Sequence, residues 1–139
     1  MKHILLIFIC LLFTMQAKAS EGGEGWSLSD DGTLTISADI SGIPWSDRES
    51  IKKVIINDGV TYICNVAFSG CSSLSSINIP ESVTSIGYWA FSNCSSLTSI
   101  NIPESVTSIG EQAFSGCSSL SSINIPEGVT SIGEYAFSY

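Results

Sequence analysis

Acidic side chains are the first groups in this sequence whose type and spacing suggest chemistry. Asp30 and Asp31 are adjacent, and Glu81, Glu104 and Glu127 recur at an interval of 23 residues. Two carboxylates on either side of a glycosidic bond can hydrolyse it, one as the acid and the other as the base or nucleophile. However, the adjacent pair falls in a predicted turn, and the glutamates recur only because the sequence around them recurs. Catalysis normally breaks a repeat at one place, so neither set predicts an active site.

Nucleophilic and metal-assisted chemistry lack the partner side chains that they need. The serine-rich links, such as Ser72-Ser73, have no histidine or lysine partner to activate a hydroxyl group. The single histidine, His3, lies at the start of the chain. The later cysteines form no C-x-x-C pair, which a tetrahedral zinc site commonly uses. We therefore predict that the protein is not an enzyme, that it has no catalytic residues, and that it binds no metal ion or cofactor.

Cysteine spacing leaves two interpretations open. An even number of cysteines in an exported protein allows a disulfide framework. Cys71, Cys94 and Cys117 are 23 residues apart; if equivalent residues stack, they lie about 4.8 Å from one another, as residues on neighbouring strands do. That spacing admits a disulfide and equally suits a stack of small buried thiols. We favour buried thiols, with a bridge between Cys64 and Cys71, or between neighbours in the column, as the alternative.

An internal repeat sets the elements that must position these residues. Residues 74–96 and 97–119 are identical at 19 of 23 positions, residues 120–139 form a shortened copy, and residues 51–73 form a diverged first copy. The chain therefore carries three full units and one partial unit over residues 51–139. One column of aromatic residues fixes the register, and its members are Phe68, Phe91, Phe114 and Phe137.

Within each unit, the pattern changes from strand to turn. In residues 74–79, Ile77 and Ile79 alternate with polar residues, which predicts a short strand that Pro80 ends. A second extended piece should follow over residues 83–86, with Gly87 in the turn after it. Ala90, Phe91 and Cys94 then have the spacing of a helical turn. One unit buries almost nothing alone, so the units must stack into a β-rich repeat solenoid with a continuous core.

The repeat also resembles a known family. Its pattern, L-x-x-I-x-I-P-x-x-V-T-x-I-G-x-x-A-F-x-x-C, is similar to that of the BspA-like leucine-rich repeat proteins, which are surface proteins of bacteria and protists. The first unit departs from the pattern, with Asn57 in place of the proline and Cys64 in place of the glycine. The resemblance implies a leucine-rich-repeat fold. It also implies an adhesin-like role toward host matrix proteins or other cells.

Residues 1–19 are predicted to be a secretory signal peptide. Lys2 gives a positive start, residues 4–13 are an unbroken apolar run, and Ala17-Lys18-Ala19 supplies the small residues that signal peptidase requires. The run is shorter than the roughly 20 residues that a membrane span needs. A lipid on Cys10 is the alternative, although Cys10 lies inside the apolar run.

Residues 20–50 are predicted to form an N-terminal cap. After a lead at residues 20–25, which we expect to be flexible, alternating residues at 26–28 and 34–36 flank an Asp-Gly turn, and this pattern is typical of a β-hairpin. The resemblance to the family implies the same module. It should cover the open edge of the first unit with Trp26, Leu28, Leu34, Ile36 and Trp45. The alternative is that the two tryptophans bind sugar.

Charge excludes two classes of partner. Residues 20–139 contain three basic and thirteen acidic residues, a net charge of −10, and the basic residues are Arg48, Lys52 and Lys53. Three cations cannot neutralise a run of phosphates, so we predict no nucleic-acid binding. Attraction to anionic lipid headgroups is excluded for the same reason.

Two surfaces are candidates for binding a protein. The first is the pair of residues that follows Ile-Gly, or Ile-Cys in the first unit. These pairs vary while the core columns do not, and we call them the variable ridge: Asn65-Val66, Tyr88-Trp89, Glu111-Gln112 and Glu134-Tyr135. Tyr88, Trp89 and Tyr135 are its aromatic members, and aromatic residues anchor many interfaces. The second surface is the polar strand column of Ser76, Asn78, Ser99, Asn101, Ser122 and Asn124. The alternative is a varied surface with no partner.

Together these features predict an exported, non-enzymatic binding protein of the cell surface. The alternative is a structural or self-assembling surface component, because the last unit stops at Tyr139 with no polar unit after it. Its edge should then associate end-on with another chain, or fray, or continue in a longer array of which this chain is a fragment. A carbohydrate-active enzyme is less favoured, because it would require a cleft with paired carboxylates.

Cleavage after Ala19 should give an exported product that begins at Ser20, because the small residues precede that bond. Mass spectrometry of the intact secreted protein tests this. An uncleaved Met1, or a lipid mass on Cys10, would contradict it.

Overall fold

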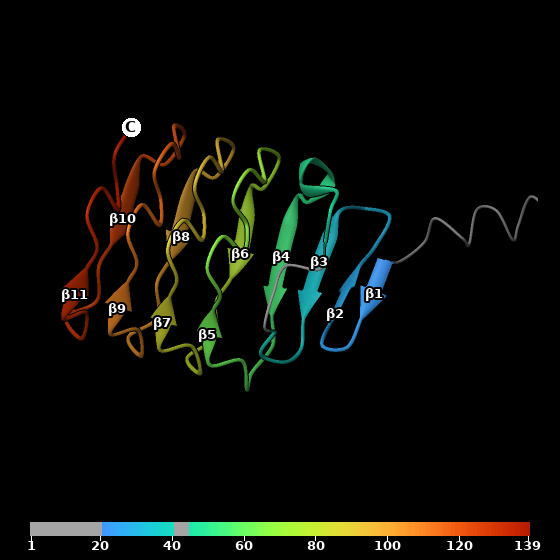
Figure 1. The fold of residues 1–139 in the computed structure, drawn as a ribbon, viewed down its shortest axis with the longest axis horizontal. Helices are drawn as coiled ribbons and strands as arrows, with labels where there is room; N and C mark the ends of the chain where they lie inside the picture. The colour runs from blue at the N-terminus through green and yellow to red at the C-terminus, as the bar shows by residue number, and fades with distance from the viewer. Residues whose placement is uncertain (1–20, 41–44) are drawn as a thin grey trace, which may run out of the picture.

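Two short strands in each unit stack on their equivalents in the neighbouring units. This arrangement is seen in a computed structural model that describes residues 21–40 and 45–139. The coils follow one another along a single axis, with the hairpin cap at one end and the C-terminus at the other (Figure 1). The predicted β-rich solenoid with 23-residue units and an N-terminal hairpin is confirmed. The predicted signal peptide lies outside the described residues.

The first ladder of strands contains β4 (Lys53–Ile56), β6 (Ser76–Asn78), β8 (Ser99–Asn101) and β10 (Ser122–Asn124). β4 pairs with β6 in parallel, and β8 pairs with β10 in parallel, with identical residues opposite one another in the second pair. The sheet is divided between β6 and β8, so its order is β1-β2-β3-β4-β6 in one part and β10-β8 in the other.

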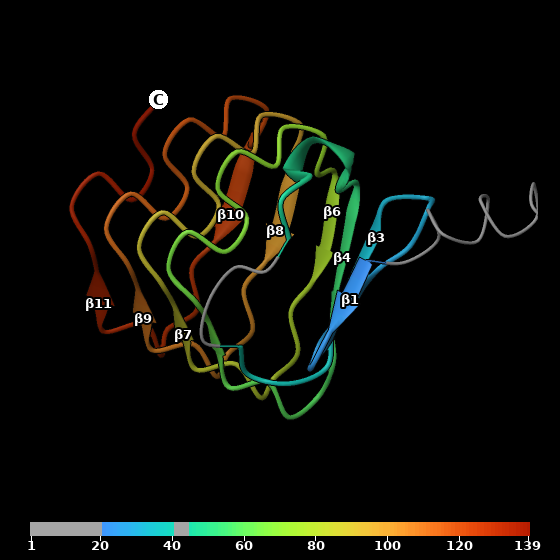
Figure 2. The ribbon, with the colours of Figure 1, turned by 45° about the vertical axis from the view of Figure 1, so that its right-hand side comes forward.

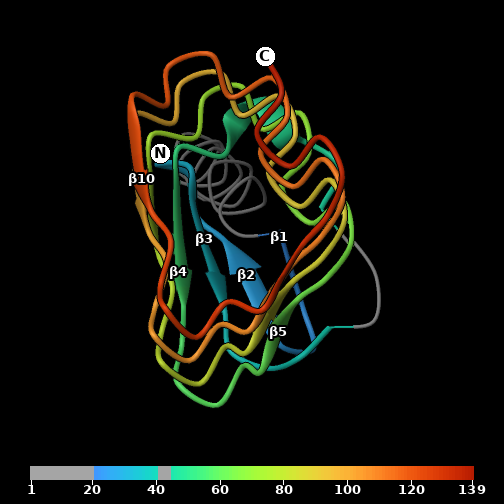
Figure 3. The same ribbon diagram turned by 90° about the vertical axis from the view of Figure 1, so that its left-hand side faces the viewer.

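The second ladder contains β5 (Tyr62–Ile63), β7 (Ser85–Ile86), β9 (Ser108–Ile109) and β11 (Ser131–Ile132). These strands form one parallel sheet in the order β11-β9-β7-β5. Viewed along the solenoid, the two ladders lie on opposite sides of an elongated coil (Figure 3). The buried side chains fill the space between them.

The third side of each coil is made of turns. The amide of Cys94 donates to the carbonyl of Phe91 at 3.1 Å, and the amide of Leu97 donates to that of Cys94 at 3.1 Å. Other amides on this side donate to the next coil instead, as Phe91 N does to Ala113 O at 2.7 Å. The predicted helical-turn spacing is therefore realised as separate turns. In the described part of the chain, the only helix is the 3-10 turn η1 (Arg48–Ser50).

A ladder of aromatic rings forms the centre of the core. Phe68, Phe91 and Phe114 are buried, and their ring centroids are 5.2 Å apart in both steps. Phe137 continues the stack at 5.4 Å and is half-buried. At the other end Trp45 stacks on Phe68 at 5.8 Å, and Trp26 meets Trp45 edge-on at 5.9 Å.

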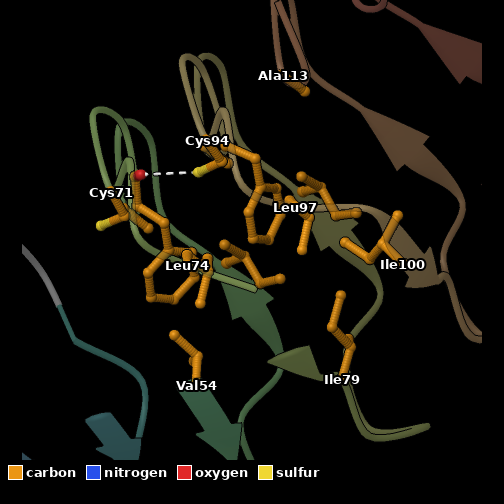
Figure 4. Packing of buried hydrophobic residues seen from close by; sticks show 14 of the residues in the cluster. Val54, Cys71, Leu74, Ile79, Cys94, Leu97, Ile100 and Ala113 are labelled. Carbon is orange, nitrogen blue, oxygen red and sulfur yellow. Dashed lines mark hydrogen bonds between the residues drawn. The ribbon is translucent and has the colours of Figure 1, made fainter. Parts of the chain in front are cut away.

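The cysteines form a second buried column beside the rings. Figure 4 shows Cys71 and Cys94 in successive coils next to Leu74 and Leu97. Cys94 Sγ donates to the carbonyl of Phe68 at 3.1 Å, and Cys117 Sγ donates to that of Phe91 at 3.0 Å. Burial raises the pKa of Cys71 to about 11. The thiol of Cys117 and burial together raise the pKa of Cys94. The thiols of Cys71 and Cys94 are therefore held protonated at neutral pH.

The cap extends the first ladder with antiparallel strands. β2 (Trp26–Leu28) and β3 (Thr33–Ile36) form the predicted hairpin, and β3 then pairs with β4 in parallel. The turn places only Gly32 at positive φ, 84°, so it is a three-residue loop that ends in a left-handed glycine. The expected flexible lead is wrong for Glu21–Gly23, which form strand β1 along β2.

Trp45 and Arg48 complete the first coil by occupying the place of a preceding one. Trp45 lies 23 residues before Phe68, and its indole Nε1 donates to the carbonyl of Ala67 at 3.0 Å. Arg48 Nη1 donates to the carbonyls of Val66, Ala67 and Ser69 at 3.2, 3.3 and 2.8 Å. In later coils, backbone amides of the preceding coil bind the equivalents of the Ala67 and Ser69 carbonyls, as Phe68 N does to Ala90 O at 2.7 Å. The side chains of the cap therefore satisfy, at Ala67 and Ser69, acceptors that a preceding coil would otherwise bind.

The glycine column has a different cause from the one expected. Gly87 and Gly110 have ordinary φ, so the turn itself does not require them. A Cβ on Gly110 would lie 2.5 Å from both the carbonyl carbon of Gly87 and the amide nitrogen of Tyr88. Glycine is needed because successive coils approach one another backbone to backbone at this point.

Truncating Phe114 to alanine should lower the free energy of unfolding by about 3–5 kcal/mol, since the ring is buried between two others. Ser99→Ala, on the exposed strand face, should change it by less than about 0.5 kcal/mol. Urea denaturation followed by circular dichroism measures both. If the two variants had the same free energy of unfolding, the aromatic ladder would not be a main source of core stability.

Candidate functional site

The variable ridge lies at the corner that follows the second ladder. Each strand of β5, β7, β9 and β11 ends one residue before the glycine column, and the ridge residues come directly after it. Tyr88, Trp89 and Tyr135 are 57%, 45% and 67% exposed, which makes them three of the most exposed large hydrophobic side chains. The structure therefore places the aromatic members of the ridge at the surface.

The second ridge position has a left-handed backbone in every unit. Val66, Trp89, Gln112 and Tyr135 have φ values of 61°, 53°, 51° and 55°. This conformation costs an L-residue roughly 1–2 kcal/mol. It aims the amide at the next coil, where Trp89 N donates to Glu111 O at 2.9 Å and Gln112 N donates to Glu134 O at 2.9 Å. The fold fixes the backbone here and leaves the side chain undetermined, which explains why this position varies.

The aromatic residues of the ridge do not form one continuous patch. Tyr88 and Trp89 are adjacent in one coil, while Tyr135 belongs to the coil after next. Glu111 and Gln112 lie between them, and Gln112 Nε2 donates to Glu111 Oε1 at 3.2 Å. A partner that contacts both aromatic sites must therefore also contact a polar, acidic stretch.

A shallow groove runs beside the ridge across several coils. Its volume is ≈ 560 Å³. One wall is the first ridge position of all four units, and the other residues come from the second ladder and the glycine column: Asn65, Tyr88, Glu111, Glu134, Ser85, Ile86, Gly87, Ser108, Ile109, Gly110, Ser131 and Gly133. The groove was not predicted, because it arises from the glycine column, whose members contribute no side chain to the surface.

The polar strand column lies on the first ladder, away from the ridge. Ser76, Asn78, Ser99, Asn101, Ser122 and Asn124 are all exposed. They belong to β6, β8 and β10, and the turned view in Figure 2 shows these strands on the side away from β7, β9 and β11. One partner surface cannot easily contact both candidate sites, so the two are alternatives.

The carboxylates that were considered for catalysis belong to separate parts of the structure and make different hydrogen bonds. Asp31 belongs to the hairpin turn, where hydrogen bonds from Ser29 and Thr33 lower the pKa of its carboxyl group. Glu81, Glu104 and Glu127 are exposed after the first ladder, and Glu81 Oε2 accepts a hydrogen bond from the amide of Ser105 at 3.3 Å. Within residues 21–40 and 45–139, no group of three or more His, Cys, Asp or Glu side chains is arranged to hold a metal ion.

A ladder of threonines and its cap were missed from the sequence. Thr84, Thr107 and Thr130 each donate a hydroxyl to the threonine carbonyl of the preceding coil at 3.2–3.3 Å. Asp39 ends this ladder, because its two oxygens accept from Thr61 N at 2.7 Å and Thr61 Oγ1 at 2.6 Å. Desolvation raises the pKa of Asp39, but the bonds from Thr61 outweigh it and lower the pKa overall. The 23-residue threonine column was the available signal.

Stacked 23-residue coils with parallel strands on two sides and turns on the third define a leucine-rich-repeat solenoid. Residues 44–139 match the family described as "BspA type Leucine rich repeat region (6 copies)". The chain belongs to this family. The match begins at residue 44, whereas the first predicted unit begins at residue 51. The match therefore includes Trp45, which stacks on the first phenylalanine of the aromatic ladder.

Several solved structures are similar to this chain. A leucine-rich repeat protein from Bacteroides ovatus is 37% identical, with a TM-score of 0.69, over 76% of this chain and 28% of that one. A leucine-rich repeat protein of T. pallidum is 27% identical, with a TM-score of 0.68, over 86% of this chain and 67% of that one. A leucine-rich repeat protein from Eubacterium ventriosum is 31% identical, with a TM-score of 0.57, over 77% of this chain and 37% of that one.

This chain therefore spans little more than a quarter of the Bacteroides ovatus protein. No curated protein matches the chain significantly. In the described part of the chain, no helix has the length and hydropathy to cross a membrane.

Trp89→Gly should leave the free energy of unfolding unchanged or raise it by up to about 1 kcal/mol, because glycine adopts positive φ without steric cost. Gly110→Ala in the neighbouring coil should lower it by more than about 2 kcal/mol, because the added Cβ meets backbone. Urea denaturation measures both variants. Equal losses of stability would mean that the Trp89 side chain supports the fold and is not free to serve as a contact.

Proposed function

We propose that this protein is exported and binds another protein at the cell surface through the variable ridge. The observation that carries the proposal is the exposure of Tyr88, Trp89 and Tyr135, at 57%, 45% and 67%, on a rigid array. Exposed aromatic residues are typical of interaction sites, and they supply large contact area at low entropic cost. The expected partner is a host matrix protein or a protein on another cell, in an adhesin-like role.

The rigidity of the ridge supports this proposal. In the first three units the second ridge position, at positive φ, donates a backbone hydrogen bond to the next coil, as in Trp89 N to Glu111 O at 2.9 Å. The side chains are thus presented from backbone that is already ordered before binding. A preorganised surface loses less conformational entropy when a partner docks. We propose binding without catalysis, because the ridge is a repeated surface and carries no single distinguished acid, base or nucleophile.

Replacing Tyr88 and Trp89 together by alanine should weaken binding to a responding partner by at least about tenfold, since buried aromatic anchors dominate interface energies. Biolayer interferometry of the full chain against a panel of purified matrix proteins measures this. The matched control replaces Asn78 and Asn101 by alanine on the first ladder, and melting curves verify the fold of both variants.

Loss of binding only in the Asn78 and Asn101 variant would move the site to the strand column. An absence of binding to every protein of the panel, together with concentration-dependent association in sedimentation, would favour assembly over the ridge proposal. A Trp89-independent interaction with the panel would also contradict the ridge as the contact surface.

A further inference from the structure

The repeats contain acidic side chains and no basic ones after Lys53. From residue 54 to residue 139 there is no lysine, arginine or histidine, while six acids are present: Asp58, Glu81, Glu104, Glu111, Glu127 and Glu134. Lys52 and Lys53 precede this segment, and Arg48 is engaged with three carbonyls of the first coil. Carboxylates on the three units from residue 74 onward therefore have no cation from their own coils. A partner of the repeats must tolerate or exploit this charge.

Two of these acids line the groove beside the ridge. Glu111 and Glu134 occupy the same column in successive coils, and Tyr88 occupies it in the coil before them. Neighbouring coils are about 4.8 Å apart at paired strands, so the wall from Tyr88 to Glu134 is about 10 Å long. Its order is one aromatic ring followed by two carboxylates. An arginine or lysine can stack on the ring and pair with a carboxylate at the same time.

The floor of the groove excludes one common mode of peptide binding. The amides of Gly87, Gly110 and Gly133 already donate to the preceding coil, at 2.9, 2.8 and 2.8 Å. An incoming segment therefore cannot pair with these amides as an added strand would. Small side chains, Ser85, Ser108 and Ser131, line the same groove. Recognition must come from side chains of the occupant, with the glutamates supplying the only charge.

We propose that this groove docks an extended segment of a partner protein that carries arginine or lysine side chains. The segment lies along the solenoid axis, across β7, β9 and β11, with a cation between Glu111 and Glu134 and an adjacent cation or apolar group over Tyr88. About three extended residues cover the length of this wall. The inference rests on the proposed function and adds to it the chemistry of the partner and a second contact beside Trp89.

The chain offers a matched control for this proposal. Glu104 and Glu127 belong to the same two units as Glu111 and Glu134, are exposed, and do not line the groove. Glu111→Gln with Glu134→Gln removes two carboxylates from the groove wall. Glu104→Gln with Glu127→Gln removes two carboxylates from elsewhere on the same coils. The net charge changes equally in both double variants, so long-range attraction changes similarly.

Fluorescence anisotropy of a labelled peptide with alternating arginine and glycine measures binding to the full chain. The same peptide with citrulline in place of arginine keeps the shape and removes the charge. The groove variant should bind the arginine peptide at least about tenfold more weakly, and the control variant should change affinity by less than about twofold. Binding should also weaken steeply as salt is raised, because the contacts are solvent-exposed ion pairs.

Equal losses in the two double variants would overturn the proposal, because they would show attraction to net charge alone. Equal affinity of the citrulline peptide, or equally tight competition by spermine, would also overturn it. Failure of the peptide to bind, while a matrix protein still binds through Trp89, would reject the groove and leave the proposed function standing. A peptide that binds through the groove, while the whole matrix panel fails, would reject the matrix partner and retain the groove.

Discussion

Every part of this molecule depends on the close stacking of one coil on the next. At the glycine column the backbones come so near that even a methyl group would collide, since a Cβ on Gly110 would be 2.5 Å from Tyr88 N. At this spacing each side chain packs mainly against its own copy in the adjacent coils. Aromatic rings, thiols and threonine hydroxyls all tolerate such like-on-like stacking. Charges do not, and the acids of residues 22–40 and 45–139 are all exposed, where solvent can screen them.

The same constraint makes the first coil a special problem, because its outward carbonyls have no preceding coil. The cap solves this with side chains in place of backbone. Trp45 provides a ring and an N–H, and Arg48 provides one guanidinium nitrogen for three carbonyls. Asp39 plays the corresponding role for the threonine ladder, where it accepts from both the amide and the hydroxyl of Thr61. The cap therefore makes the contacts that a preceding coil would make, although its sequence does not follow the repeat.

The repeat period made the fold and the hydrophobic columns predictable from sequence, since Phe91 and Phe114 could only be aligned in one register. The hairpin was predictable from its Asp-Gly turn. The position of Trp45 over the first unit was predicted. The hydrogen bonds of Trp45, Arg48 and Asp39 were not, because hydrogen bonds from side chains to another coil's backbone leave no periodic trace. The positive φ of Trp89 was hidden for a related reason: the residue types at that position, Val, Trp, Gln and Tyr, are not those that favour it. The groove followed from the glycines and could be seen only once the coils were stacked.

Because the two central units are nearly identical, the folding chain must avoid pairing a coil with the wrong neighbour. Residues 74–96 and 97–119 agree at 19 of 23 positions, and the ring spacing on either side of Phe91 is the same 5.2 Å. A coil that skipped its proper neighbour and docked on the next would find nearly the same contacts, so these units alone discriminate poorly between correct and shifted pairings. The cap has no second copy. Its Trp45 and Arg48 are joined by a short stretch of chain to the first coil, which they contact. A chain that assembles outward from this end therefore adds its coils in the correct order.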